Sequence, residues 1–174
     1  MNRREWWCGA GVALIVAGAG GGLAAGCGSR GATFPEFKAG AMPAEQTWAG
    51  VYYNPVYGNL HLTAQDTNIV GRWKRTDSSH WGELSGTVEG NLLRFKWTEH
   101  TYGTVGPAAD LLGNGVFLFK MGQNDIPELD GEYALEDSDK TADWHCIKQV
   151  NVKPDLNSIN GESPTGAPSG DQWQ

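Results

Sequence analysis

Residues 48–73 read WAGVYYNPVYGNLHLTAQDTNIVGRW, and this stretch decides the fold class. Apolar residues recur at every second position, as at Leu60, Leu62 and Ala64, and the residues before the Asn-Pro pair behave in the same way. A period of two is typical of β-strands, and the breaks at Asn-Pro and Asp-Thr-Asn are typical of turns. The stretch therefore predicts three strands joined by short turns.

The same alternation continues through the rest of the central part of the chain. It predicts strands near residues 47–53, 59–65, 68–75, 82–88, 91–98, 115–121, 128–135 and 144–149. No long stretch has helical spacing, and the best candidate for one helical turn is Pro107–Leu112. We therefore expect an all-β domain of six to eight short antiparallel strands, either a small β-barrel or a β-sandwich.

A glycine pattern bears on the choice between these two architectures. Glycine flanked at a distance of two by large apolar residues occurs at Gly50, Gly71, Gly86 and Gly131. Glycine weakens a strand interior, so four such positions need a physical reason. Strong coiling of the strands, with large neighbours filling the freed space, is one reason, and small barrels need it. The pattern favours a barrel, and four bulges in a sandwich are the alternative.

The segment Val51–Trp73 also resembles the opening hairpin of avidins and other calycins. The shared features are an aromatic-Asn pair, a glycine at the start of the second strand and a Gly-x-aromatic end of the third. The resemblance implies a calycin-like barrel. Asn59 stands where avidins place a serine that contacts their ligand, and no later ligand motif can be matched. The resemblance therefore does not imply biotin binding.

The first 27 residues have the organisation of an export signal. Arg3 and Arg4 precede an uncharged, glycine-rich run from Ala10 to Ala25. This run is shorter than the roughly 20 apolar residues of a membrane-spanning helix, and glycine is a poor helix former. We expect a removable signal rather than a permanent transmembrane anchor.

The end of this run, LAAGC at residues 23–27, resembles the lipobox of bacterial lipoprotein precursors. Leu23 stands four residues before Cys27, and Ala24 occupies the usual leucine position, which the family tolerates. The resemblance implies cleavage after Gly26 and lipidation of Cys27 with acyl chains such as palmitate, several of which anchor a protein stably. The alternative is a secretory signal cleaved near Ala25, with Cys27 an ordinary thiol.

The resemblance also bears on location. Gly28 and Ser29 follow Cys27, and in lipoproteins of enteric-type bacteria the absence of aspartate there implies sorting to the outer membrane. We therefore expect a protein anchored by lipid in the cell envelope, in the outer membrane of a Gram-negative bacterium. Whether it faces the periplasm or the exterior stays open.

The composition of the chain suggests four regions. Residues 1–26 form the signal peptide, and residues 27–46, rich in Gly, Ala and Pro, are expected to form a lipidated, flexible tether. Residues 47–150 hold the all-β domain, which is long enough for an independent core. Residues 151–174 are polar and interrupted by Pro and Gly, so we expect a disordered tail.

Charge and cysteine content exclude some classes of function. The 174 residues include 13 Lys and Arg against 20 Asp and Glu, a formal charge of −7, and no basic run, so nucleic-acid binding is not expected. Three cysteines cannot form a disulfide framework. Since Cys8 and Cys27 belong to the signal segment, we expect Cys146 to be a buried apolar side chain rather than a nucleophile.

No pattern in the sequence indicates catalysis, a cofactor or a metal site. The histidines His61, His80, His100 and His145 lack the spacing of metal ligands. The acidic stretch EDSDKTAD at 136–143 lacks the glycine and closing glutamate of an EF-hand, so we expect a solvated hairpin loop. Glu83 and Glu99 are the conceivable pair of facing carboxylates for a hydrolase.

Tryptophan is the remaining distinctive feature of the domain, with Trp48, Trp73, Trp81, Trp97 and Trp144. Three of them, Trp48, Trp73 and Trp97, share the inward phase of their strands and are expected in the core. Trp81 shares its strand face with polar residues, where an indole can stack on a sugar or anchor a partner. Trp81 and Trp144 are the candidate contacts, and in an open barrel Thr101–Gly113 would form a lid over an apolar pocket.

These observations lead to one hypothesis and two alternatives. The hypothesis is a lipid-anchored envelope protein with a non-catalytic barrel that binds a small apolar or sugar ligand or forms part of an envelope complex. The first alternative is a filled barrel that acts only as a protein-interaction module. The second is an envelope hydrolase that uses Glu83, Glu99 or the 136–143 loop.

Overall fold

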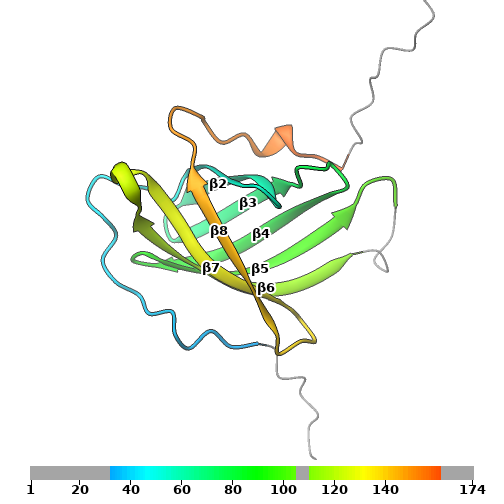
Figure 1. Cartoon of the computed structure of the whole chain (residues 1–174), viewed down its shortest axis with the longest axis horizontal. Helices are drawn as coiled ribbons and strands as arrows, with labels where there is room; N and C mark the ends of the chain where they lie inside the picture. The colour runs from blue at the N-terminus through cyan, green and yellow to red at the C-terminus, as the bar shows by residue number, and fades with distance from the viewer. Residues whose placement is uncertain (1–31, 105–109, 162–174) are drawn as a thin grey trace, which may run out of the picture.

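The computed structural model describes residues 32–104 and 110–161 and has eight antiparallel strands in one closed barrel (Figure 1). Each strand pairs with the next along the chain, and β8 returns to pair with β1. The strands are β1 (Gly50–Asn54), β2 (Gly58–Gln65), β3 (Asn68–Lys74), β4 (His80–Glu89), β5 (Leu92–Thr101), β6 (Leu111–Met121), β7 (Pro127–Leu135) and β8 (Thr141–Lys148). The prediction of a small antiparallel barrel is confirmed, and a sandwich is excluded.

One local prediction was wrong. Leu111 and Leu112, expected at the end of a helical turn that starts at Pro107, instead begin β6 and pair with Glu99 and Thr98 of β5. The ladder of backbone hydrogen bonds outweighs local helical preference there. The expected lid over Thr101–Gly113 is consequently divided between two strand ends, and residues 105–109 lie outside the described residues.

The side chains that point into the barrel form one continuous apolar core. It consists of Trp48, Tyr52, Leu60, Leu62, Ile69, Trp73, Leu84, Leu93, Phe95, Trp97, Phe117, Phe119, Leu129, Trp144 and Cys146, all buried.

The predicted role of the inward glycines holds at two positions. A Cβ on Gly71 would lie 2.5 Å from Leu62 Cδ2, and one on Gly131 would lie 2.7 Å from Phe117 Cδ1. Large neighbours therefore occupy the space that these glycines leave.

The barrel closes along a short seam between β1 and β8. Only Tyr52–Lys148 and Tyr53–Ile147 are paired across it. Two further contacts support the seam: Gln149 N–H donates to Val51 O at 2.7 Å, and the Asn54 side chain donates to His145 O at 2.6 Å. In the described part of the chain, the first residues of β8 pair with β7 alone.

The N-terminal segment, residues 32–46, packs along the outside of the barrel. Ala32 and Phe34 are buried there against outward side chains of β5, β6 and β7, namely Leu92, Val116 and Ala134. Hydrogen bonds extend the contact to the turn between β4 and β5, where Gly40 N–H donates to the Asn91 side chain at 2.7 Å. The expected flexible tether is therefore docked over the part that is described. Cys27 and the predicted signal lie outside the described residues.

The C-terminal segment, residues 151–161, also packs on the outside, near β2 and β3. It contains the short 3-10 helix η3 (Leu156–Ser158), and Ile159 is buried. Arg72 Nη1 donates to the backbone oxygens of Leu156 and Ile159, each at 3.3 Å. The expected disorder thus does not extend to these residues, because outward polar groups of the barrel hold the backbone. Residues 162–174 lie outside the described residues.

None of the helices in the described ranges is long and apolar enough to cross a membrane.

Candidate binding site at the barrel mouth

One end of the barrel, here called the mouth, has a recess lined by aromatic and charged side chains. At this end β1, β3, β5 and β7 finish and the following strands begin. The lining consists of Tyr57, Trp73, Arg75, Trp97, Glu99, Tyr133 and Trp144. Except for Tyr57, which lies in the turn between β1 and β2, these residues continue the inward phase of β3, β5, β7 and β8. Strand alternation therefore collects them at one place.

The aromatic rings at the mouth pack edge to face. The centroids of Trp73 and Trp144 are 5.2 Å apart, and those of Trp97 and Tyr133 are 5.6 Å apart, with interplanar angles of 71° and 80°. This is the arrangement that ring quadrupoles favour. Glycines on neighbouring strands make it possible, since a Cβ on Gly82 would collide with the Trp73 ring. A Cβ on Gly113 would likewise collide with the ring of Trp97.

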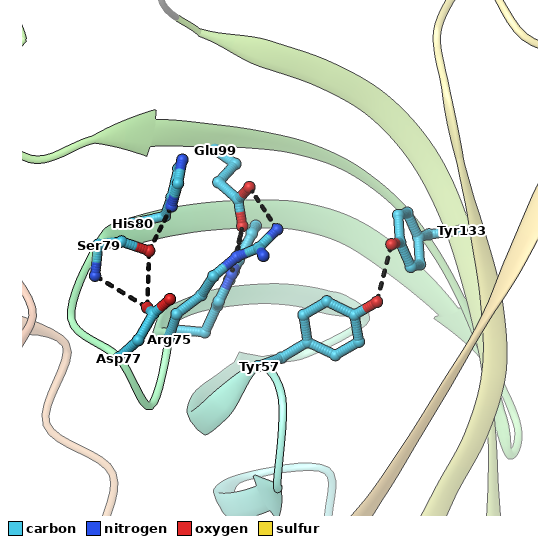
Figure 2. A network of polar contacts seen from close by, with 8 residues as sticks. Tyr57, Arg75, Asp77, Ser79, His80, Glu99 and Tyr133 are labelled. Carbon is cyan, nitrogen blue, oxygen red and sulfur yellow. Dashed lines mark hydrogen bonds and ion pairs between the residues drawn. The ribbon is translucent and has the colours of Figure 1, made fainter.

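An ion pair between a partly exposed Arg75 and a buried Glu99 lies beside these rings (Figure 2). Arg75 donates from Nε to Glu99 Oε2 at 2.9 Å and from Nη2 to Oε1 at 2.8 Å. Trp73 Nε1 adds a longer bond of 3.4 Å to Glu99 Oε2. Glu99 is 4% exposed and is the one buried charged side chain among the described residues. Hydrogen bonding to Glu99 raises the pKa of Arg75, so the guanidinium stays charged.

Two tyrosines meet across the mouth. The hydroxyls of Tyr57 and Tyr133 are 2.8 Å apart, and Figure 2 shows them pointing toward each other. Burial, followed by the contact with Tyr133, raises the pKa of Tyr57, so the hydroxyl keeps its proton. The Arg75 guanidinium carbon lies 5.6 Å from the centroid of the Tyr57 ring. Tyr57 thus covers both the ion pair and the recess.

The space left inside the recess is small. The cavity measures about 20 Å³, and a single water needs roughly 10–15 Å³ by the same kind of measure. Because the core side chains fill the remainder of the lumen, a larger ligand can enter only if the side chains at the mouth move. Tyr57 belongs to a turn rather than to a strand and is only partly buried, which makes it the side chain best placed to move.

The two candidate contact residues lie on opposite faces of the barrel wall. Trp144 points inward, is 3% exposed and lines the recess. Its Nε1 has no hydrogen-bond partner among the described residues. Trp81 points outward and stacks on His100 with centroids 4.4 Å apart, and a Cβ on Gly161 would lie 3.1 Å from its ring. The C-terminal segment therefore covers part of the Trp81 surface.

The carboxylates of the hydrolase alternative do not face each other. Glu83 points outward from β4 and pairs with Arg72 at 3.5 Å, whereas Glu99 points inward and pairs with Arg75. A wall of the barrel separates the two carboxylates, so they cannot act on one bond from two sides. The 136–143 stretch is largely exposed, and no group of three metal-ligating side chains occurs in the described ranges.

An Asp-Ser-His cluster at the β3–β4 turn also lacks the geometry of a nucleophile with its base. Ser79 Oγ donates to Asp77 Oδ1 at 2.6 Å and lies 2.6 Å from His80 Nδ1. The hydroxyl proton of Ser79 is thus directed at Asp77. The contact with His80 therefore requires Nδ1 of His80 to donate a proton to Ser79 Oγ. A catalytic triad needs the histidine between the other two groups. The hydrogen bond from the Ser79 side chain lowers the pKa of Asp77, which fits a turn-stabilising role.

Cys146 has no nucleophilic character at neutral pH. The side chain is fully buried in the core, and burial raises the pKa of its thiol to about 12. Only the thiolate reacts as a nucleophile. The prediction of a buried apolar side chain is confirmed.

Sequence reasoning missed most of the polar part of the mouth. Arg75 and Glu99 each stand two residues after an inward tryptophan, Trp73 and Trp97, on strands that end at the same rim. Opposite charges at inward positions of the same rim were the available signal for the ion pair. Tyr57 lies in a turn, where strand alternation does not predict which way a side chain points. Nothing in the sequence indicated that it would contact Tyr133.

In comparisons with known proteins, no protein-family model, curated protein or solved structure matches this chain.

Proposed function

We propose that the chain is a lipid-anchored protein of the cell envelope whose barrel binds a small ligand at its mouth without catalysis. The observation that carries the ligand site is the set of five aromatic rings around the Arg75–Glu99 ion pair. Ligand sites are typically apolar and aromatic recesses with a few well-placed polar groups. The lipid anchor rests on the LAAGC motif at residues 23–27.

A sugar or another small ring fits the chemistry of the mouth best. The faces and edges of Trp97, Tyr133 and Trp144 offer stacking surface, and the planar Arg75 and Glu99 groups offer donors and acceptors in fixed directions. The ligand would occupy the place of the Tyr57 ring, because the present cavity is about the size of one water. A long apolar ligand deep in the lumen would have to displace the core itself.

The size of the cavity favours a second candidate function, a filled barrel that acts as a protein-interaction module. Ligand pockets usually measure about 300–1,000 Å³, far above the space at this mouth. In that case the aromatic rings and the ion pair serve only to close the end of the barrel.

A thermal-shift screen on wild type and Tyr57→Ala separates the two candidates. The panel contains neutral monosaccharides and disaccharides, amino sugars, planar heterocycles and short-chain lipids. Ligand binding predicts a raised Tm for a ring-shaped member of the panel, since saturation at 100 times Kd adds about 2.7 kcal/mol of stability. Tyr57→Ala, which uncovers the recess, is expected to keep or strengthen that response. A panel to which neither protein responds supports the filled barrel.

The anchor has its own test. We expect the intact mass of the membrane-extracted protein to correspond to a chain that starts at Cys27 and carries acyl chains, and Cys27→Ser to abolish both the processing and the membrane association. A mature protein that starts there without lipid would make the chain a secreted domain and would leave the ligand site as a separate question.

A further inference from the structure

The first described residue, Ala32, lies at the mouth end of the barrel. Its backbone oxygen accepts a hydrogen bond from the Asn114 side chain at 3.2 Å, and its side chain packs in the outer cluster with Ala134. Asn114 and Ala134 lie near the start of β6 and the end of β7. Figure 1 shows the blue N-terminal segment reaching this end of the barrel beside the hairpin that joins β7 to β8.

The distance from Ala32 to the predicted anchor is short. Cys27 stands five residues earlier in the chain, and five residues span at most about 18 Å even when fully extended. If Cys27 carries lipid, the bilayer surface lies within that distance of Ala32. The far end of β6, at Met121, is roughly 24 Å beyond Asn114 along the strand.

The rim of the mouth beside Ala32 carries exposed leucines. Leu111, Leu112 and Leu135 are 47%, 48% and 43% exposed. Leu112 is two residues from Asn114 on the same outward strand face. Leu111 precedes it and Leu135 follows Ala134, and both continue the inward phase at the rim, where Leu135 pairs with Gly113. All three therefore lie at the rim close to the residues that hold Ala32. Neighbouring exposed apolar side chains mark a surface for a partner or a membrane.

We propose that the β6–β7 side of the mouth faces the bilayer and that Leu111, Leu112 and Leu135 enter its interface, while the β1–β2 side, with Tyr57, faces water. This inference rests on the proposed lipid anchor at Cys27. The anchor fixes which end of the molecule is nearest the membrane, and the leucines supply apolar surface at that end. The acidic hairpin residues Glu136, Asp137 and Asp139 beside Leu135 remain in water, so insertion is shallow and weaker on anionic than on zwitterionic lipid.

The orientation can be tested on the full mature protein reconstituted in phosphatidylcholine vesicles. Cys146 is fully buried and Cys27 would be blocked by lipid, so a cysteine-reactive environment-sensitive dye reports on one introduced cysteine. Leu112→Cys is compared with Val150→Cys, an exposed apolar position after β8 at the opposite end, 63% exposed in the wild type. Wild type serves as the labelling control and is expected to take up no dye.

The expected result is a severalfold higher emission from Leu112→Cys than from Val150→Cys, together with quenching by lipids that carry a nitroxide near the headgroup. Equal emission and no quenching at the two positions would overturn the inference. Emission that is high at Leu112→Cys but insensitive to nitroxide lipid would also overturn it, because the dye would then be shielded from water by the protein itself rather than by the bilayer. The intact mass of the same sample shows which proposal has failed. An acylated protein whose rim stays in water refutes only the orientation. An unacylated protein refutes both the anchor and the orientation.

Discussion

Two segments outside the strands pack against the barrel, and they are held in different ways. The N-terminal segment buries Ala32 and Phe34 in an apolar cluster on β5–β7. The C-terminal segment buries one large apolar side chain, Ile159, and is otherwise held by hydrogen bonds to outward polar groups such as Arg72. The first attachment depends on surface removed from water, and the second depends on charge and hydrogen-bond geometry.

The comparison shows that a terminal segment can be held on the barrel in two physically different ways. Burial of apolar surface contributes about 25 cal/mol per Å² and is insensitive to moderate salt. Half-exposed hydrogen bonds contribute about 1 kcal/mol each, and those to charged groups weaken as salt rises. We therefore expect the N-terminal segment to unfold with the barrel and the C-terminal segment to detach on its own.

The largest expected effect is that of Phe34→Ala. The side chain is 7% exposed within the outer cluster, and loss of a buried phenylalanine costs about 3 kcal/mol or more. Urea unfolding of the whole protein should show this loss. Phe37→Ala, at a partly buried position of the same cluster, is the control and should cost less. A smaller loss for Phe34→Ala than for the next variant would reverse the comparison.

Ile159→Ala should have the next largest effect, and only locally. The side chain is 4% exposed, and its truncation should weaken the docking of the C-terminal segment by up to about 2 kcal/mol. Hydrogen exchange at the Ile159 amide, which donates to Leu156 O, is the measurement. Val152→Ala, at a half-exposed position, is the matched control and should leave exchange unchanged. If Ile159→Ala lowered the free energy of global unfolding by the same amount as it weakens docking, the C-terminal segment would unfold together with the barrel.

Arg72→Met and Arg94→Met compare the polar contacts of the two segments directly. Arg72 donates twice to the C-terminal segment, and Arg94 Nη2 reaches Phe37 O of the N-terminal segment at 3.4 Å. We expect Arg72→Met to weaken docking by about 1 kcal/mol and Arg94→Met to have almost no effect, because apolar contacts already hold its segment. Limited proteolysis should release only the C-terminal segment. Release of the N-terminal segment by Arg94→Met would show that its apolar contacts are insufficient.

Salt should produce the smallest effect. Raising the ionic strength to about 0.5 M screens exposed charges, so exchange at the Asn157 amide, which donates to Asp155 Oδ1 in the C-terminal segment, should become faster. Exchange at the Gly40 amide of the N-terminal segment, which donates to the neutral Asn91 side chain, should not change. The same acceleration at both amides would remove the distinction between the segments.

The barrel itself was predictable because strand alternation is a property of consecutive residues. Docking of the terminal segments was not predicted. The residues around Phe34 and Phe37 do not alternate between apolar and polar, and their sequence does not indicate which surface they would pack against. One signal was present elsewhere. Val116 and Leu118 occupy the outward phase of β6, so this strand is apolar on both faces, which indicates cover on both sides.

The candidate site was only half predictable for a similar reason. Trp73 and Trp97 were assigned to the inside by their phase, and the structure places both there. The partners of the site depend on which strand ends meet in three dimensions. Arg75 follows the end of β3 and Glu99 lies on β5, with β4 between these strands, and the register that brings the two residues together is a property of the closed sheet.

The short β1–β8 seam has a consequence for how the protein folds. All other strand pairs are hairpin neighbours, whereas the seam joins Tyr52 to Lys148, almost one hundred residues away. The entropy cost of closing a loop rises with its length, and contacts of this kind form late and slowly. The chain should therefore pass through an open eight-stranded meander with unpaired edges at β1 and β8. Such edges pair readily with other chains, so the time needed to close two residue pairs should limit the yield of folded protein at high concentration.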